Sequence, residues 1–395
     1  MADRRLMVLN LGSTSFKCKL YRMGATETLL ASGGVESIGG EGRCRVQAGE
    51  QVADGPCACA THMDALALCL TAIDRMGVPA ELDTLDAIGY KAVHGGTLSG
   101  AHRVDAALLG EMERMVSFAP AHNPVYLDMM RAVGERCPHT VQIACFETAF
   151  HATVPLERAV YGVPYEWVEA YGVRRYGFHG SSHSYIAWKL AREAPAARRV
   201  ISAHLGGSSS LCAILDGRSV ACTMGATPQS GLFQNNRVGE LDAFVLPVLA
   251  EKRGGLAAVM RELSTQSGFL GISGVSNDLR LVESAASKGN TRAALAVRAF
   301  EDAIVGYIGM QTAFLGGLDA LAFTGGIGMN DALLRERITR RLGWLGVAMD
   351  ARLNVARHEG RISTADSRVA VWSLETNEEL MVARGCLRVL EARDV

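Results

Sequence analysis

The first strongly patterned stretch of the chain, residues 6–21, predicts two strands joined by a polar turn. Four apolar residues in succession, 6–9 (LMVL), indicate a strand that is buried on both faces. A polar Gly/Ser segment follows at residues 10–15 (NLGSTS), and beyond Lys17 apolar and polar residues alternate as in a second strand. Backbone N–H groups and hydroxyls at such a hairpin tip can bind an anion such as phosphate. Taken alone, the pattern also fits an ordinary polar β-turn.

The same pattern recurs at residues 199–215. An apolar strand again ends in one polar residue, followed by Leu205-Gly206, a serine-rich turn and a second strand that contains Cys212. When Leu11-Gly12 is aligned with Leu205-Gly206, Cys18 falls opposite Cys212. Such a repeat indicates a duplicated unit, and ligand sites commonly lie between two halves of this kind. We therefore expect one anion-binding hairpin in each half and a ligand cleft between them.

Several helices have clear sequence signals. Thr61 and Asp64 form a capping box, and the helix that follows is closed by Gly77. A longer helix is striped by apolar positions 300, 304 and 308 and stops at Gly316. A strand at residues 322–324 meets the glycines of 325–328, and we expect the next helix to begin near Asn330. Such a turn suits a nucleotide, although the Walker pattern is absent.

Ionisable side chains follow the ends of predicted buried strands. Lys91 closes one strand, Glu147 closes another, and His122 lies between two prolines in a loop. Further along, His179 lies between two glycines, and Arg237 is the one arginine of an amide-rich loop. Open α/β sheets place their ligand sites just beyond strand ends, so we expect Lys91, His122 and Glu147 to lie at a ligand site.

Composition narrows the class of protein. A length of 395 residues favours two domains, and 49% hydrophobic residues provide ample core. A net charge of −1 without a basic patch argues against nucleic acid or an anionic membrane as the main partner. Without an 18-residue apolar segment or a signal-peptide pattern, we expect a cytoplasmic protein with no membrane association. The ten scattered cysteines favour reduced structural thiols over a zinc site.

A series of motifs in order along the chain resembles the acetate kinase family of short-chain acyl kinases. The motifs are NxGSxSxK from Asn10, then VHGG, APxHNP, TAFH, YGFHGxSH, GISGVSNDxR, FTGGIG and TNEELxxAR. The resemblance implies an α/β fold of two duplicated RNase H-like (actin-like ATPase) domains with a nucleotide cleft between them. The expected domains are 1–150 completed by 380–395, and 151–379. It also implies a homodimer and reversible transfer of the ATP γ-phosphoryl group to a carboxylate, giving an acyl phosphate and ADP with Mg²⁺.

The resemblance also implies roles for the residues that match the family's motifs. Stabilisation of the transferring phosphoryl group is implied for Arg237, His179 and His122, with Lys91 and Glu147 as further catalytic positions. The implied nucleotide and phosphate positions are Asn10, Ser13, Ser15, Lys17, His204, Gly206, Gly207, Ser208, Asp278, Arg280, Gly325, Gly326, Ile327, Gly328 and Asn330. The implied metal positions are Asn10 and Glu378. The implied substrate pocket consists of Lys91, Val93, Ala121, Phe178 and Pro228.

Five positions depart from the family's motifs: Lys91 replaces Arg, Glu147 replaces Asp, Gly207 replaces Asn, Met329 replaces Glu and Ala121 replaces Leu. Lysine cannot make the bidentate contact of arginine, and we hypothesise that the longer Glu147 re-forms an ion pair with Lys91. The smaller Ala121 predicts room for a longer or branched acid, worth about 0.8 kcal/mol per buried CH₂.

Two other functions stay open at this point. A sugar or polyol kinase of the same superfamily would need a general base for a neutral hydroxyl, and Glu147 is the one candidate. A nucleotide-binding regulatory protein that has lost catalysis is the second alternative. The retained Arg237, His179 and Glu378 argue against it.

Overall fold

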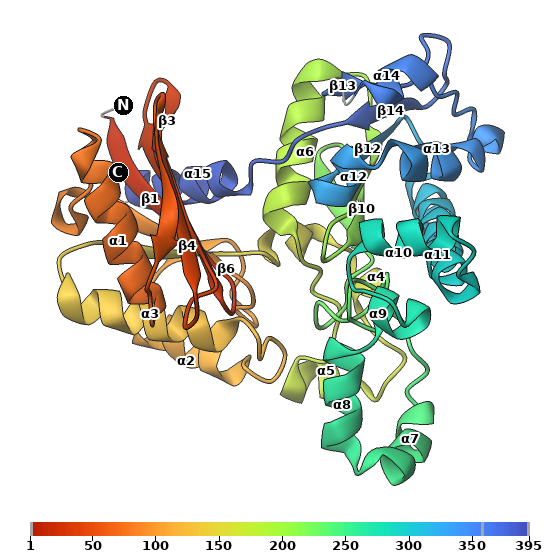
Figure 1. Ribbon diagram of the computed structural model, residues 1–395, viewed down its shortest axis with the longest axis horizontal. Coiled ribbons are helices and arrows are strands. Elements are labelled where there is room, and N and C mark those ends of the chain that lie inside the picture. Colours follow the sequence, from red (N-terminus) through yellow and green to blue (C-terminus); the bar gives the residue numbers. More distant parts are fainter. Residues whose placement is uncertain (1–2, 357–358, 393–395) are drawn as a thin grey trace. The chain divides into compact units, whose positions relative to one another are not determined.

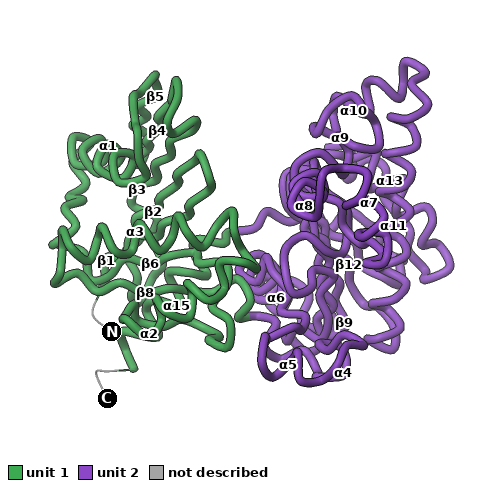
Figure 2. Tube along the Cα trace, turned by 90° about the horizontal axis from the view of Figure 1, so that it is seen from below, with its two compact units in different colours: residues 1–149, 377–395 green, residues 150–376 purple. Residues whose placement is uncertain are grey.

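The computed structural model describes residues 3–356 and 359–392, which form two compact units (Figures 1 and 2). Unit 1 consists of residues 1–149 with 377–395, and unit 2 of residues 150–376. Each unit is built around one mixed sheet. The C-terminal segment thus returns to complete the unit that the N-terminus begins.

Unit 1 contains an eight-stranded sheet in the order β5-β4-β3-β2-β1-β6-β8-β7. Its strands are β1 (Arg4–Leu11), β2 (Ser15–Met23), β3 (Glu27–Glu36), β4 (Gly42–Ala48), β5 (Gln51–Cys57), β6 (Ala87–Ala92), β7 (Ala101–Arg103) and β8 (Gln142–Phe146). The first five form an antiparallel meander, and β1, β6 and β8 run parallel. The hairpin predicted at residues 6–21 is confirmed as β1 and β2.

Helices cover both faces of this sheet (Figure 1). They are α1 (His62–Arg75), η1 (Leu82–Thr84), α2 (Ala106–Arg114), α3 (Asn123–Arg136) and α15 (Glu378–Glu391). Leu66 of α1 and Tyr126 of α3 share a buried core with Leu9 of β1. A side chain at Gly89 of β6 would meet Cys386 of α15, so α15 packs closely on the opposite face. The predicted capping box of α1, Thr61 with Asp64, is confirmed.

Unit 2 contains a six-stranded sheet in the order β11-β10-β9-β12-β14-β13. Its strands are β9 (Arg199–His204), β10 (Ser210–Leu215), β11 (Arg218–Cys222), β12 (Ala320–Thr324), β13 (Gly360–Arg361) and β14 (Ala370–Ser373). The order β11-β10-β9-β12-β14 matches β3-β2-β1-β6-β8 of unit 1, with the same antiparallel and parallel pairings. The two units therefore repeat one topology, which confirms the predicted duplication.

The helices of unit 2 pack on both faces of its sheet. They are η2 (Ala149–Thr153, which begins in unit 1), α4 (Leu156–Ala159), α5 (Tyr165–Tyr171), α6 (Gly180–Glu193), α7 (Val245–Arg253), α8 (Leu256–Thr265), α9 (Gly268–Ser273), α10 (Leu279–Ser287), α11 (Thr291–Leu315), α12 (Gly325–Asn330), α13 (Ala332–Arg340), η3 (Gly343–Leu345) and α14 (Ala351–Val355). Ile201 of β9 faces α11, whereas Val200 faces α6, as the alternation of a buried strand requires. The predicted long helix is α11, capped by Gly316.

The helix expected to begin near Asn330 is α13, which starts at Ala332 with Asp331 as its N-cap. A short helix that the sequence pattern did not predict precedes it. Helix α12 begins at Gly325, directly after β12, with Thr324 as its N-cap. Gly325 has φ of 77°, and a Cβ there would lie 2.6 Å from the carbonyl oxygen of Leu205. Glycine alone fits this approach, so the chain can turn into a helix without an intervening loop.

Candidate active site

A cavity of about 870 Å³ in unit 2 collects many of the residues expected to bind a nucleotide. Of those positions, the cavity is lined by Gly206, Gly207, Asp278, Arg280, Gly326, Ile327 and Asn330. They come from the β9–β10 turn, the start of α10 and the start of α12. The first turns of two helices and a Gly/Ser turn thus meet at one cavity, an arrangement that suits phosphate groups.

Glycines leave the floor of this cavity open. A Cβ at Gly326 would have no atom within 4 Å, and one at Gly207 would meet only the side-chain amide of Asn235. Asp278 caps α10 and forms an ion pair with Arg280 at 2.5 Å. The hydrogen bond from Arg280 is the main cause that lowers the pKa of the Asp278 carboxyl. Asp278 is therefore ionised and holds the turn at the cavity edge.

Other expected nucleotide positions of unit 2 lie outside that lining. Gly325 and Gly328 lie in the turn of α12, where the amide of Gly328 donates to the carbonyl of Leu205. Ser208 lies in the β9–β10 turn. His204 stacks on the ring of His179 at 4.3 Å and bonds Ser182.

Histidines and serines form a hydrogen-bonded cluster around the start of α6. His179 is the N-cap of α6 in the left-handed region, with φ of 55°. Its Nδ1 lies 2.8 Å from Ser210 Oγ, which also lies 2.9 Å from Nε2 of His183. A non-glycine residue in this backbone region costs free energy and is held there by its surroundings. Ser210 therefore fixes the orientation of the His179 ring.

The cluster also determines the protonation state of His183. Burial lowers the pKa of His183 well below its ordinary value, and the neighbouring histidines lower it further. His183 is consequently neutral and bonds Ser202 through Nδ1 at 2.9 Å. A neutral imidazole has one donor and one acceptor, so His183 donates to one of the two serines, Ser202 and Ser210, and accepts from the other.

Arg237 lies in the loop before α7. Its Nη1 donates to Gln234 Oε1 at 3.3 Å, and in the described part of the chain no carboxylate forms an ion pair with it. Burial lowers the pKa of Arg237, but an arginine remains charged at neutral pH. A half-buried cation whose charge no carboxylate neutralises is suited to an incoming anion.

Unit 1 presents a second group of expected site residues, gathered at one end of β1, β2 and β6. Asn10 donates to Glu379 Oε1 at 3.1 Å, and Lys19 donates to Glu379 Oε2 at 2.9 Å. Lys91 at the end of β6 forms an ion pair with Glu378, and both side chains are about one-seventh exposed. The N-terminus of α15 thus brings two carboxylates onto the strand ends.

The electrostatics of Lys91 follow from this arrangement. Burial would lower the pKa of Lys91, but the charges of Glu378 and then Glu147 outweigh burial and raise it. The ion pair that the structure shows for Lys91 is with Glu378, and Glu147, which is buried, acts on it through its charge. Glu378 of the C-terminal helix is therefore a partner of Lys91 that the sequence did not predict, and the Lys91–Glu147 pair stays a hypothesis.

The remaining expected positions are distributed over both units. Ser13 lies in the β1–β2 turn, and Ser15 and Lys17 lie in β2. His122 is the N-cap of α3. In unit 1, Val93 packs on the core and Ala121 is exposed. In unit 2, Phe178 is buried, and the carbonyl of Pro228 accepts from Gln234 at 2.8 Å.

Sequence patterns alone missed Glu379, Lys19 and Ser210. Two adjacent glutamates in the TNEEL motif do not show which of them contacts Lys19, and a serine in a Gly/Ser segment carries no distinct signal. The alternation of Lys17 and Lys19 on one strand face was the available clue to Lys19.

Unit 1 offers oxygen donors for a metal ion at the N-terminus of α15. Among the described residues, no group of three or more His, Cys, Asp or Glu side chains is arranged to hold a metal ion. Mg²⁺ is commonly bound through one or two carboxylates together with substrate phosphates and water. Glu378, Glu379 and the amide of Asn10 are oxygen donors of that kind, so the donor set fits Mg²⁺.

The repeated topology and the phosphate-suited cavity define a protein of the actin-like ATPase class. Residues 5–384 match the model of the Acetokinase family. The chain is 40% identical to a propionate kinase of Citrobacter rodentium over 98% of this chain and 97% of that one. It is 38% identical to an acetate kinase of Halothermothrix orenii, over 98% of this chain and all of the other.

Comparison with a solved structure leads to the same family. The propionate kinase of Francisella tularensis superimposes with a TM-score of 0.89 at 33% identity, covering 97% of this chain and 98% of that one. The chain therefore belongs to the acetokinase family, and the resemblance inferred from its motifs is confirmed.

Proposed function

We infer that this protein transfers the γ-phosphoryl group of ATP to a short-chain carboxylate, reversibly giving an acyl phosphate and ADP. Family membership over residues 5–384 carries this inference, and relatives named acetate kinase and propionate kinase support the substrate class. Membership also favours an acyl kinase over the sugar-kinase alternative.

Phosphoryl transfer to a carboxylate requires cations and hydrogen-bond donors more than it requires a general base. A carboxylate is already an anionic nucleophile, so the site must bring two anions together and neutralise an in-line transition state. We assign this role to Arg237, which forms no ion pair with a carboxylate among the described residues, with His179, held by Ser210, and His122. Lys91 and Glu147 complete the catalytic group.

Nucleotide binding is assigned to the cavity of unit 2. The Gly/Ser turn 206–208 and the first turn of α12 would hold the phosphates, with Asp278 and Arg280 at its edge. The β1–β2 hairpin, with Asn10, Ser13, Ser15 and Lys17, is the equivalent phosphate-binding element of unit 1. Asn10 and Glu378 would hold Mg²⁺, which when bound neutralises phosphate charge.

A panel of substrates tests the activity. We expect phosphoryl transfer from ATP to acetate, propionate and butyrate, trapped as hydroxamates, and no transfer to sugars. Transfer to a sugar or polyol hydroxyl would support the other kinase class. Nucleotide binding without transfer to any acceptor would support a regulatory protein.

A glycine substitution tests the nucleotide site separately. Gly326→Val should weaken ATP binding at least tenfold, since the new side chain would occupy open cavity space without a clash. Gly306→Val is the matched control, because Gly306 lies in α11 with equally open surroundings and does not line the cavity. Equal ATP affinity for both variants would place the nucleotide elsewhere.

We also propose that two copies of the chain associate. The segment around α7 and α8, which extends from unit 2 in Figure 1, exposes Leu241, Phe244, Val248, Leu256 and Met260. Phe244 is 89% exposed, and exposed apolar side chains gathered on one segment are typical of an interaction site. Sedimentation should give a dimer, and Phe244→Asp should shift it toward monomer.

The expected cytoplasmic location stays a prediction from the N-terminal sequence. In the described residues, no helix is long and apolar enough to cross a membrane.

A further inference from the structure

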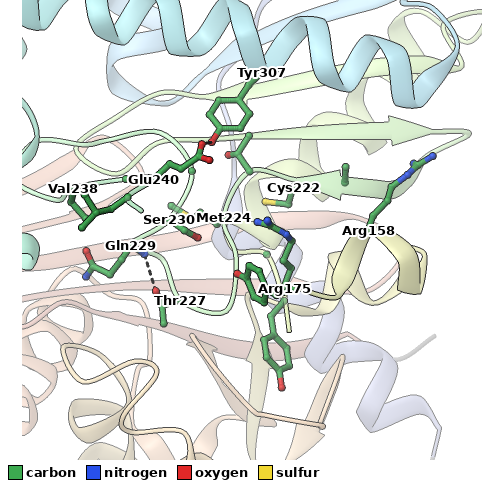
Figure 3. A pocket seen from close by; sticks show the side chains of 18 of the residues that line it. Arg158, Arg175, Cys222, Met224, Thr227, Gln229, Ser230, Val238, Glu240 and Tyr307 are labelled. Atoms are coloured by element: carbon green, nitrogen blue, oxygen red, sulfur yellow. Dashed lines mark hydrogen bonds between the residues drawn. The ribbon is translucent and has the colours of Figure 1, made fainter. Parts of the chain in front are cut away.

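A second cavity of unit 2, about 910 Å³ in volume, has a thiol in its wall (Figure 3). It lies between α4, β11, the loop after β11 and α11, and shares no lining residue with the nucleotide cavity. Cys222, the last residue of β11, is the one cysteine among the described residues that line it. Cys222 is partly exposed and lines the cavity, so a small solute in the cavity can approach its side chain.

A second thiol lies opposite Cys222 on the neighbouring strand. Cys212 of β10 is the cross-strand partner of Cys222, and both side chains therefore point to the same face of the sheet. The next pair along, Leu211 with Thr223, carries the backbone hydrogen bond, which makes the cysteine pair a non-hydrogen-bonded one. Cα atoms in such a pair are about 4.5 Å apart, within the range that a disulfide spans.

His151 contacts both the thiols and the chain just before His179. Its Nδ1 lies 3.9 Å from Cys212 Sγ, and its Nε2 donates to the carbonyl of Phe178 at 2.9 Å. Cys222 Sγ lies 3.9 Å from the same carbonyl. One imidazole therefore connects the thiol pair to the residue that precedes His179.

The two thiols differ in acidity. Burial raises the pKa of the Cys222 thiol, but the charge and hydrogen bond of His151 outweigh burial and lower it. Burial is the leading cause that raises the pKa of Cys212 despite the same imidazole. The thiolate is the nucleophilic form of cysteine, so Cys222 is the attacking thiol and the fully buried Cys212 can only follow.

We propose that Cys222 and Cys212 form a peroxide-sensitive thiol pair, in which Cys222 is oxidised from the cavity and Cys212 then closes a disulfide across β10 and β11.

The chemistry balances with a peroxide as the only oxidant. The Cys222 thiolate attacks one peroxide oxygen, the O–O bond breaks, and the leaving hydroxide takes a proton to become water. Cys222 is thereby oxidised by two electrons to a sulfenic acid. The sulfur of Cys212 then attacks Cys222, the S–S bond forms and the S–O bond breaks. The released hydroxide takes the Cys212 proton, so two thiols and one hydrogen peroxide give a disulfide and two waters.

Formation of the disulfide should affect the proposed active site. Cys222 Sγ would move away from the Phe178 carbonyl toward Cys212, and His151 would lose the neighbouring thiols. Because Phe178 precedes His179, whose backbone is held in the left-handed region, we expect oxidation to lower phosphoryl transfer. This consequence rests on the proposed function, whereas the disulfide itself does not.

Peptide mass spectrometry tests the disulfide directly. The reduced full chain is treated with hydrogen peroxide, its remaining thiols are alkylated, and it is digested with trypsin. Cleavage after Arg199, Arg218 and Arg237 places Cys212 in peptide 200–218 and Cys222 in peptide 219–237. We expect these two peptides to be joined by a bond that dithiothreitol breaks. In Cys212→Ser, a sulfenic acid at Cys222 should be trapped by dimedone.

The chain contains a matched control pair. Cys145 and Cys386 in unit 1 have sulfurs 4.0 Å apart, but both are buried, and the pKa of Cys386 is raised well above its ordinary value by its hydrogen bond to Cys145 and by burial. This pair should stay reduced under the same treatment. A disulfide between Cys145 and Cys386 without one between Cys212 and Cys222 overturns the proposal. A disulfide between two copies of peptide 219–237 also overturns it.

Activity gives a second readout. Wild-type transfer should fall in step with the cross-link and return with dithiothreitol, while Cys222→Ala should resist peroxide. A cross-link that forms without any loss of activity would remove the connection to His179. Absence of transfer in the reduced enzyme would instead contradict the proposed function.

Discussion

The ion pair between Lys91 and Glu378 provides the sharpest test of how unit 1 is assembled. Lys91 lies at the end of β6 and Glu378 in the first turn of α15, with side chains 15% and 13% exposed. Lys91→Met keeps the length of the side chain and removes its charge. It removes the cation that forms the ion pair with Glu378, and removing one partner of a buried pair costs about 3–5 kcal/mol.

The double variant isolates the pairing. Lys91→Met combined with Glu378→Gln removes both charges, and replacement of both partners is often nearly neutral. We therefore expect the double variant to recover most of the lost stability, with a coupling free energy of about 0.5–3 kcal/mol in the cycle. Arg43→Met is the matched control, since it removes an exposed ion pair with Asp54 in the same unit. It should leave stability close to that of the wild type.

The assay must report on unit 1 alone. All four tryptophans, Trp167, Trp188, Trp344 and Trp372, lie in unit 2, so tryptophan fluorescence in urea follows that unit and serves as an internal control. Hydrogen exchange at the amides of β6 and α15 follows unit 1. Lys91→Met should speed exchange there and leave the fluorescence midpoint unchanged.

Two outcomes would refute this reasoning. If Lys91→Met and Arg43→Met change exchange equally little, the Lys91–Glu378 pair does not hold α15 to β6. If the double variant is no more stable than Lys91→Met, the loss comes from packing and not from an unpaired charge. The pKa of Lys91 is raised, so the pair's contribution should be complete below about pH 10 and lost as the pH rises through the folded-state pKa.

Three further predictions concern single side chains. Arg237→Ala should lower kcat on the order of 10³-fold with nearly unchanged ATP affinity by calorimetry, and near-normal turnover would remove Arg237 from the mechanism. Ala121 is exposed, so Ala121→Leu should not disturb the core; it should shift kcat/KM toward acetate against butyrate by about 1–3 kcal/mol, and an unchanged ratio would exclude an enlarged pocket. Burial raises the pKa of Glu379, but Lys19 and Lys91 outweigh it and lower it. The stability that Glu379 contributes is therefore present above pH ~4.5 and lost as the pH falls through its folded-state pKa. In Glu379→Gln, the stability of unit 1 should fall less steeply with decreasing pH than in the wild type. An unchanged pH dependence would contradict this.

Local signals in the sequence determined many elements of the fold. The apolar run before Asn10, the capping box at Thr61 and the stripe that ends at Gly316 predicted β1, α1 and α11. Each depends on residues within a few positions, where strand alternation and helix capping operate. The recurrence of the hairpin at residues 199–215 likewise predicted the duplication seen in the two strand orders.

Contacts between distant segments were decided only in the tertiary structure. The start of α12 at Gly325 depends on the carbonyl of Leu205, and the partner of Lys91 comes from α15. Ser210 contacts both His179 and His183 because β10 places it between them. The sequence by itself determined which elements form and to which family they belong. Packing decided which charges and hydroxyls meet, because those pairings depend on distances between segments that no local pattern encodes.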